Sequence, residues 1–435
     1  MINEKLKQDI EKAIESLQDE MIQVISDIIR IPSINPYIDP AQKDERIGGE
    51  TRVNEYLKLV MDKAGLRTDL WEVEKGRANL VGICKGQNGG RSLIFNGHVD
   101  TVAPGPEELW TIAGPFSGVV VDGKIYGRGA TDMKAANVAA IFAIKALLKA
   151  GYHPKGDVMV ETVSGEEMKQ PEIGTLATVD RGYRADAAIV VESSAPPYQL
   201  AILTASPGVL ILNVKIRGKA AHSSMRDEVI RAGGRGKEVA VSAVEKGMII
   251  YQGLLKLEEE WGQTKSHPAF TRPGHFTLSL TTFAGGMNGI AFIPSDCMMT
   301  YVIWHAPQDT KEQVKSEIET HINRLAQTDP WLRENPPELD WFNDYWWPPY
   351  DINCSSPICT AAATAYEAVR KEPAKYYGFT AVNDATFLNQ AGIPTITMGP
   401  GSIEIAHTAN EHIAISDLMD AVKIYALTIV EWCGI

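Results

Sequence analysis

The sequence predicts an α/β protein, in which a larger domain with a mostly parallel sheet is interrupted by an inserted α+β domain of ferredoxin-like type. Short apolar runs alternate with helix-length segments in both halves of the chain, which is typical of parallel strands buried on both faces. This pattern changes near residue 206 and returns near residue 349. The chain of 435 residues also exceeds the length at which one hydrophobic core stops growing, roughly 250–300 residues.

The larger domain is expected over residues 1–205 and 349–435. Residues 1–30 carry apolar side chains at helical spacing and predict a long helix that stops before Pro32. A second helix is predicted over Glu50–Ala64. The later predicted elements are the strands Asn79–Cys84 and Ser92–Asn96, the hairpin Val119–Tyr126, helix Lys134–Ala150, the strands Asp157–Val163 and Ala187–Val191, helix Ile358–Lys371, strand Pro394–Met398 and helix Ile415–Cys433.

The inserted domain is expected over residues 206–348. Its predicted elements are strand Gly208–Arg217, helix Lys237–Trp261, the strands Phe276–Phe283 and Cys297–Trp304, helix Lys311–Ala326 and strand Pro337–Phe342. The order βαββαβ is that of a ferredoxin-like unit. The aromatic segment Trp341–Tyr350 is interpreted as the linker that returns to the larger domain.

Composition narrows the function classes. Lysine and arginine number 42 against 55 acidic residues, a net charge of −13, which disfavours nucleic acid and anionic membranes as partners. Five cysteines without close pair spacing indicate a reducing compartment rather than a disulfide scaffold. The start of the chain lacks the apolar segment of a signal peptide. We therefore expect a cytoplasmic protein that does not cross a membrane.

Acidic residues and histidines follow the predicted strands of the larger domain, where each strand ends. Ligands of open α/β sheets bind at the carboxyl ends of the strands, so we expect these side chains to meet at one edge. The residues are His98, Asp100, Asp132, Glu166, Glu167, Glu192 and His407.

Each of these residues has an ordinary structural explanation when it is taken alone. Asp132 could cap the following helix, and adjacent Glu166 and Glu167 could be a solvated turn. Five carboxylates at one edge would repel one another without cations. Two histidines with carboxylates suit Zn²⁺, Co²⁺ or Mn²⁺, and Asp100 stands where it can hold the second ring nitrogen of His98. The sequence therefore favours a metal centre.

Several motifs extend this interpretation. They are GHVDTVAPG (97–105), YGRGATDMKAA (126–136), GEEMKQPEIGTLA (165–177), ES (192–193), AHSS (221–224), AVND (381–384) and GIPTITMGPGSIEIAHTANEHI (392–413). With them the chain resembles the M20 metallopeptidase family, which includes acetylornithine deacetylase, succinyl-diaminopimelate desuccinylase, aminoacylase and glutamate carboxypeptidase. The GPGSI…AH stretch is most similar to acetylornithine deacetylase-like members.

The resemblance implies a dinuclear-metal catalytic domain that binds two divalent ions, with zinc expected and cobalt or manganese as alternatives. Asp132 would bridge the ions, with His98 and Glu192 on one and Glu167 and His407 on the other. Glu166 would be the general base that acts on a metal-bridging water. Asp100 would orient His98.

The resemblance also implies that the inserted domain is a lid and dimerisation domain of a homodimer. His222 would reach the partner subunit's active site and stabilise the oxyanion of the tetrahedral intermediate. Asn288 would be another lid residue near the substrate. Gly401 and Ser402 in the matched loop would be substrate contacts.

Two positions depart from the family pattern. Trp304 and Thr386 stand where many members have arginines that bind a substrate carboxylate, and bidentate recognition is lost without arginine. We predict zinc-dependent hydrolysis of the amide of a small N-acyl amino acid or related N-acyl amine. A dipeptidase or carboxypeptidase is the first alternative, and a binding homologue without activity is the second. The aromatic run 341–347 could line an apolar pocket or pack in the core.

Overall fold

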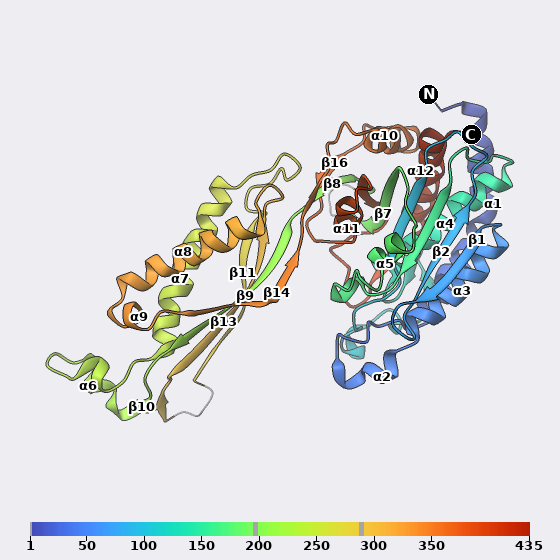
Figure 1. The fold of residues 1–435 in the computed structure, drawn as a ribbon. Helices are drawn as coiled ribbons and strands as arrows, with labels where there is room; N and C mark the ends of the chain where they lie inside the picture. Colours follow the sequence, from blue (N-terminus) through green and yellow to red (C-terminus); the bar gives the residue numbers. More distant parts are fainter. Residues whose placement is uncertain (1, 195–198, 287–290) are drawn as a thin grey trace. The chain divides into compact units, whose positions relative to one another are not determined.

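The computed structural model describes residues 2–194, 199–286 and 291–435. The chain forms two compact units, one made of Met1–Ala205 and Tyr350–Ile435 and the other of Ser206–Pro349 (Figure 1). The first unit therefore draws on both ends of the chain. No helix within the described ranges combines the length and apolarity needed to cross a membrane.

The first unit is built on one large mixed sheet with strand order β1-β2-β6-β3-β7-β17-β8-β15, and β16 pairs with β8. The strands are β1 Arg67–Glu72, β2 Ala78–Cys84, β3 Leu93–His98, β6 Val158–Val163, β7 Ala187–Ser193, β8 Ile202–Ser206, β15 Tyr350–Asp351, β16 Tyr376–Gly378 and β17 Thr395–Gly399. The central strands β6, β3, β7 and β17 run parallel. The pairs β1–β2, β2–β6 and β17–β8 are antiparallel. The predicted parallel sheet is thus the centre of a larger sheet with antiparallel flanks.

Helices cover both faces of this sheet, as the fully buried strands β3, β6 and β7 require. Gly97 faces Asn137 of α4 (Ala135–Lys149), and Phe95, on the same face of the strand, contacts Tyr425 of α12 (Ile415–Cys433). On the opposite face, Asn96 reaches Thr175 of α5. The helices of this unit are α1 Glu4–Ile29, α2 Lys43–Arg46, α3 Gly49–Lys63, α4 Ala135–Lys149, α5 Thr175–Asp180, α10 Pro357–Arg370, α11 Ala385–Gln390 and α12 Ile415–Cys433. A small sheet is formed by β4 Val119–Val121, β5 Lys124–Tyr126 and β18 His412–Ala414.

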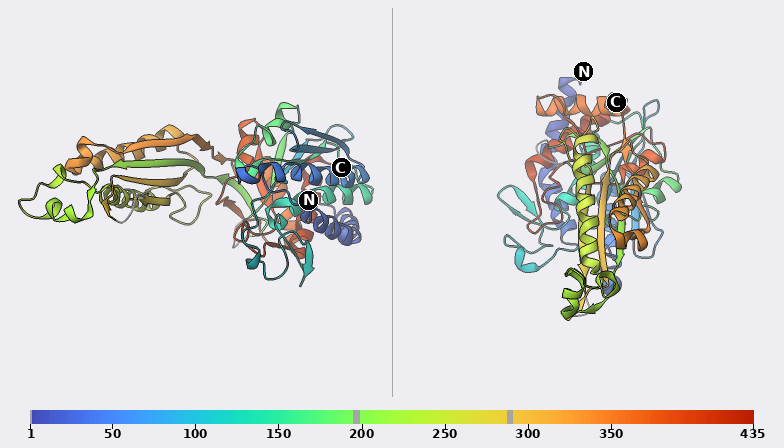
Figure 2. Two further views of the ribbon diagram at one scale, coloured as in Figure 1. Left: turned by 90° about the horizontal axis from the view of Figure 1, so that it is seen from below. Right: turned by 90° about the vertical axis from the view of Figure 1, so that its left-hand side faces the viewer.

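The second unit is a four-stranded antiparallel sheet with order β11-β13-β9-β14. The helices α7 and α8 run along its strands and pack against each other (Figure 2). Its elements are β9 Gly208–Arg217, β10 Ala221–His222, α6 Arg226–Ile230, α7 Ala243–Thr264, β11 Thr277–Gly285, β12 Phe292–Ile293, β13 Asp296–His305, α8 Lys311–Thr328, α9 Pro330–Glu334 and β14 Glu338–Trp347. The predicted ferredoxin-like order of elements is confirmed.

The predicted linker over Trp341–Tyr350 is wrong for most of its length, because β14 continues to Trp347. Trp341 and Trp346 both pair with β9, with an irregularity between them. Their indole N–H groups donate to Glu319 and His305. The aromatic run is therefore an edge strand that packs on its own unit. Helix α7 also begins later than predicted, because the Ser242 side chain accepts the N–H of Glu245 and caps it.

Candidate metal centre

The predicted site residues of the first unit lie at one edge of its sheet. β3 ends at His98, Glu166 and Glu167 follow β6, and Glu192 is the sixth residue of β7. His407 lies in the loop after β17 and has the left-handed φ of 61°. Because β6, β3, β7 and β17 run parallel, their carboxyl ends meet at this edge. Asp132 joins them from the turn between β5 and α4.

Asp132 lies between the two histidines. Its Oδ1 is 3.0 Å from Nε2 of His98, and its Oδ2 is 3.0 Å from Nε2 of His407. Each carboxylate oxygen therefore faces a different imidazole, which is the geometry of a bridging ligand.

Each histidine also faces carboxylates of its own. Oε2 of Glu192 lies 3.6 Å and Oε2 of Glu166 lies 3.8 Å from Nε2 of His98. Oε2 of Glu167 lies 3.2 Å from Nε2 of His407. By the shorter distances, His98 is paired with Asp132 and Glu192, and His407 is paired with Asp132 and Glu167.

The electrostatics of this cluster call for cations. Burial, together with the neighbouring acidic groups, raises the pKa of Glu166 well above its usual range and that of Glu192 to about 7. Burial opposes protonation of His98, but hydrogen bonds with Asp132 and Glu192 outweigh it and raise its pKa. Hydrogen bonds with Asp132 and Glu167 raise the pKa of His407 to about 11. Without a metal ion, these raised pKa values favour protons on the glutamates and histidines, because protons reduce the negative charge of the cluster. Bound cations would balance the same charge.

The residues fit a divalent metal. Ligand atoms on a tetrahedral Zn²⁺ with bonds of about 2.0–2.1 Å are separated by about 3.3 Å, and the histidine–carboxylate distances above bracket this value. His98, Asp132 and Glu167 each offer a ligand atom, and these atoms lie within 4.8 Å of one another. Imidazole and carboxylate ligands suit Zn²⁺, Co²⁺ and Mn²⁺.

Asp100 contributes in a different way from the one predicted. Nδ1 of His98 lies 2.9 Å from the main-chain oxygen of Asp100 and 3.7 Å from its carboxylate. The carboxylate instead accepts the backbone N–H groups of Gly165, Glu166 and Glu167. Asp100 therefore orients His98 through its backbone, and its side chain holds the loop that carries the two glutamates.

A second buried carboxylate holds the backbone of Asp132. Glu411 accepts the N–H groups of Thr131 and Asp132 at 3.0 and 3.2 Å and pairs with Arg128. The predicted substrate contacts Gly401 and Ser402 approach the same turn. Ser402 N–H donates to Thr131 Oγ1, and a Cβ at Gly401 would lie 2.1 Å from that oxygen.

The remaining predicted residues lie elsewhere. His222 is in β10 of the second unit, where it is exposed and its Nδ1 contacts Ser224. Asn288 falls outside the described residues. Several residues that support the site were not predicted, among them Asn35, Arg77, Gln170 and Arg128. A single buried polar residue has no spacing signature, so only the clustering of unmatched polar residues near the motifs could have suggested them.

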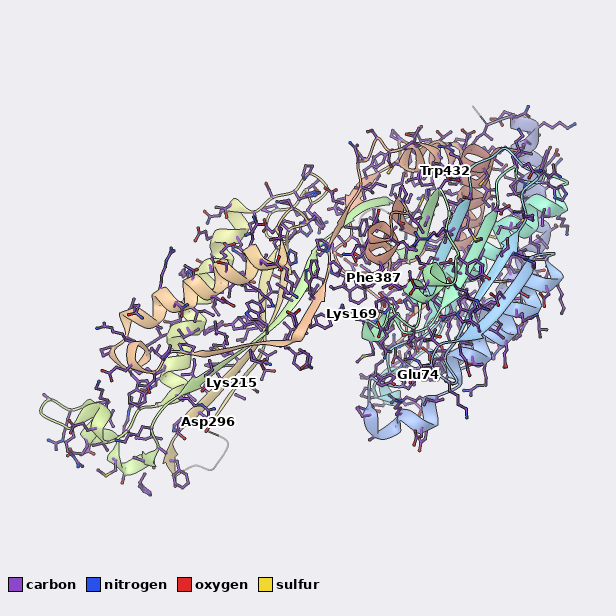
Figure 3. All side chains as sticks on the ribbon, in the orientation of Figure 1. Glu74, Lys169, Lys215, Asp296, Phe387 and Trp432 are labelled. Atoms are coloured by element: carbon purple, nitrogen blue, oxygen red, sulfur yellow. The ribbon has the colours of Figure 1, made fainter. Side chains whose placement is uncertain are left out.

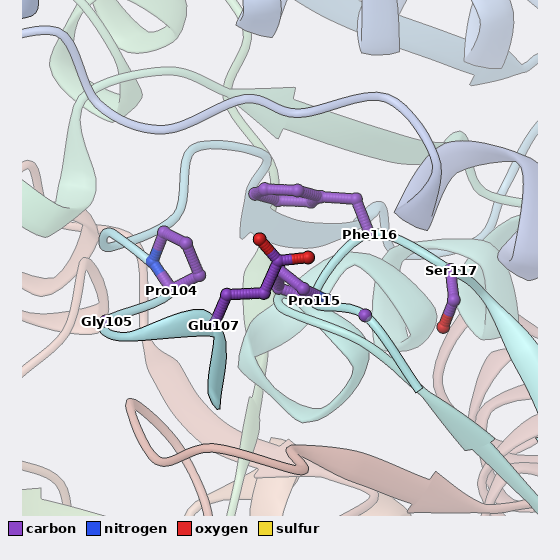
Figure 4. Close-up of a pocket in the computed structure, with 7 residues that line it drawn as sticks. Pro104, Gly105, Glu107, Pro115, Phe116 and Ser117 are labelled. Atoms are coloured by element: carbon purple, nitrogen blue, oxygen red, sulfur yellow. The ribbon is translucent and has the colours of Figure 1, made fainter. Parts of the chain in front are cut away.

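The loop after β3 forms a hollow of about 570 Å³ in the first unit. The ring of Phe116 and the carboxylate of Glu107 both face it (Figure 4). The start of this loop is attached to the metal centre, since Val102 N–H donates to Glu167 and Arg128 donates to the carbonyl of Ala103.

Comparison with known proteins finds matches over almost the whole chain. The model of peptidase family M20/M25/M40 matches residues 94–431. The chain is 32% identical to the N-formyl-4-amino-5-aminomethyl-2-methylpyrimidine deformylases of Halalkalibacterium halodurans, over 96% of this chain and 95% of that protein, and of Bacillus subtilis, over 98% and 97%. A solved tripeptidase from Staphylococcus aureus is 20% identical and superposes with a TM-score of 0.70 over 95% of this chain and 98% of its own.

These matches confirm the predicted family and the predicted class of enzyme. The similarity to acetylornithine deacetylases in particular stays a prediction. The chain belongs to peptidase family M20/M25/M40, a family of metal-dependent hydrolases that act on amide bonds.

Proposed function

We propose that the chain is a dinuclear zinc deacylase that removes a small acyl group from an amine, and that an N-formyl aminomethylpyrimidine is its substrate. The observation that carries the proposal is the pair of His–carboxylate groups around Asp132, with Glu166 beside them. The two deformylases named above support the substrate class. Their named substrate has no carboxylate, in keeping with Trp304 and Thr386 at the positions of the missing arginines.

His98, Glu192, Glu167 and His407 would hold the two ions, and Asp132 would bridge them. The ions, when bound, polarise the amide carbonyl and lower the pKa of water at the site. Glu166 takes a proton from the attacking water and passes it to the leaving amine nitrogen. Burial and the surrounding carboxylates raise its pKa, which suits a group that must both accept and release this proton.

A dipeptidase or carboxypeptidase remains the alternative, and the solved tripeptidase, at 20% identity, supports the fold alone. A homologue that binds without turnover is disfavoured because Glu166 and the five predicted ligands lie close together at the sheet edge.

The test compares N-formyl-4-amino-5-aminomethyl-2-methylpyrimidine, N-acetylornithine and a dipeptide, each with the zinc-, cobalt- and manganese-loaded protein and a chelator control. We expect kcat/KM for the formyl pyrimidine to exceed the others at least about tenfold. Dipeptide turnover without deformylation would overturn the proposal.

The second unit would serve as lid and dimerisation domain. Its edge strand β11 carries exposed Phe283, which stacks on Tyr251 of α7. Met248 and Leu255 lie one turn before and one turn after Tyr251 on the same face of α7 and are also exposed. An open strand edge beside an apolar helix face suits pairing with a second copy. In such a dimer His222 would have the role across subunits that the resemblance to the family implies.

A further inference from the structure

The loop that carries Glu166 and Glu167 is tied to a buried arginine by a chain of hydrogen bonds. Asp100 holds the N–H groups of residues 165–167, as described above. Gln170 closes the other side of the loop, because its N–H donates to the carbonyl of Gly165 at 2.8 Å. The loop is therefore held by the Asp100 carboxylate on one side and by Gln170 on the other.

The Gln170 side chain leads away from the loop to Arg77. Nη1 of Arg77 donates to Oε1 of Gln170 at 2.7 Å. The buried amide of Asn35 donates to the Asp100 carboxylate at 2.8 Å and lies 3.5 Å from Oε1 of Gln170. Asn35 thus joins the two supports of the loop.

Arg77 is itself held rigidly. Its side chain is fully buried, and Nε and Nη2 donate to the two oxygens of Glu50 at 2.6 and 2.7 Å. Nη1 also lies 3.3 Å from Oε2 of Glu74. Figure 3 labels Glu74, and it labels Lys169, the residue before Gln170. The guanidinium group is planar, so the two bonds from Nε and Nη2 to Glu50 also fix the position of Nη1. In that position Nη1 points at Gln170.

We infer that Arg77, acting through Gln170, is a positioning residue for the Glu166–Glu167 loop. The inference rests on the proposed function only in giving Glu166 and Glu167 their roles. Loss of the contact frees the loop, so that the base and one metal ligand lose their alignment while the ligand side chains remain. Supporting hydrogen bonds of this kind affect activity or metal affinity about 10–100-fold.

The test begins with Gln170→Leu, which removes the acceptor at a half-buried position. We expect kcat to fall about 10–100-fold with a smaller change in KM, weaker retention of zinc against a chelator, and faster hydrogen exchange at the amides of residues 166–170. Gln170→Glu restores an acceptor for Arg77 and should recover these properties. Glu172→Gln, exposed on the same segment, is the matched control and should leave them unchanged.

The double variant Glu50→Leu/Arg77→Met removes the buried pair without leaving a lone charge. It should reproduce the Gln170→Leu loss, and adding Gln170→Leu to it should cause little further loss. If Gln170→Leu has the same kcat as the wild type and the same hydrogen exchange at residues 166–170, the inference is wrong, whether or not the double variant folds. If the wild-type protein hydrolyses none of the amide substrates, the proposed function is wrong. The positioning role of Arg77 is still tested in that case, by hydrogen exchange of the backbone N–H groups and by zinc retention.

Discussion

Nε2 of His98 lies 3.0 Å from Oδ1 of Asp132, and both side chains are almost completely buried, with 2% and 6% of their surface exposed. Because Nδ1 of His98 faces the main-chain oxygen of Asp100, this distance requires either that both ring nitrogens carry protons or that Nε2 and Oδ1 bind the same cation.

Replacement of Asp132 by Asn should remove metal from both groups, because its two oxygens face the two histidines. We expect fewer bound ions per chain by elemental analysis. We also expect kcat/KM to fall about 10³-fold or more, since lost metal removes several kcal/mol of transition-state stabilisation. Asp122→Asn, exposed in the β4–β5 turn, is the control. Full metal content in Asp132→Asn would exclude the bridging role.

Glu166→Gln should separate catalysis from metal binding. The variant keeps the size of the side chain but cannot accept a proton, so we expect kcat to fall about 10²–10⁴-fold with metal content unchanged. Near wild-type turnover by the metal-loaded variant would show that Glu166 is not the base.

Removal of metal should destabilise the first unit, because the four carboxylates of Asp132, Glu166, Glu167 and Glu192 then lie close together without a cation between them. Ligand present at 100 times its dissociation constant stabilises a native state by about 2.7 kcal/mol. We expect the melting temperature to fall on chelation, measured by differential scanning fluorimetry, and to return with added Zn²⁺, Co²⁺ or Mn²⁺. A melting temperature insensitive to chelator and metal would argue against a metal centre here.

Glu161 should make stability depend on pH. Burial raises its pKa from 4.5 to about 7. Within the part of the chain that the structure describes, Asn96 and Thr178 donate to Oε2, and Oε1 has no hydrogen-bond partner. The native state therefore binds more protons than the unfolded chain between these values, and stability falls as pH rises through that window. The loss amounts to about 3 kcal/mol above pH 7. The melting temperature of Glu161→Gln minus that of the wild type should therefore be larger at pH 8 than at pH 5. The same difference at both pH values would contradict this assignment.

Leu255→Glu should disrupt the proposed homodimer by placing a charge on the exposed face of α7. Size-exclusion chromatography with light scattering should then report a monomer. Lys256→Glu is the comparison on the adjacent helix position, and its mass should remain that of the dimer. A wild-type monomer at micromolar concentration would remove the basis for a role of His222 across subunits.

Much of the fold followed from local patterns. The hairpin strands β4 and β5, strand β9 and helix α12 have the predicted bounds, because turn residues and apolar periodicity are properties of short segments. Strands β1 and β8 were not predicted. Arg67–Glu72 is largely polar and becomes a strand only through pairing with β2, and β8 pairs with β16 and β17 from a distant part of the chain.

The sequence by itself indicated which side chains meet at the candidate metal centre, because parallel strands present their carboxyl ends at one edge. His98 and Glu192 stand at the ends of two of these strands, and Glu166 and His407 follow two others. Only the tertiary structure decided how those side chains are held. That the Asp100 carboxylate binds the glutamate loop rather than His98, and that Arg77 reaches Gln170, depends on contacts between residues 65 to 93 positions apart. Such contacts depend on packing geometry, which no local spacing encodes.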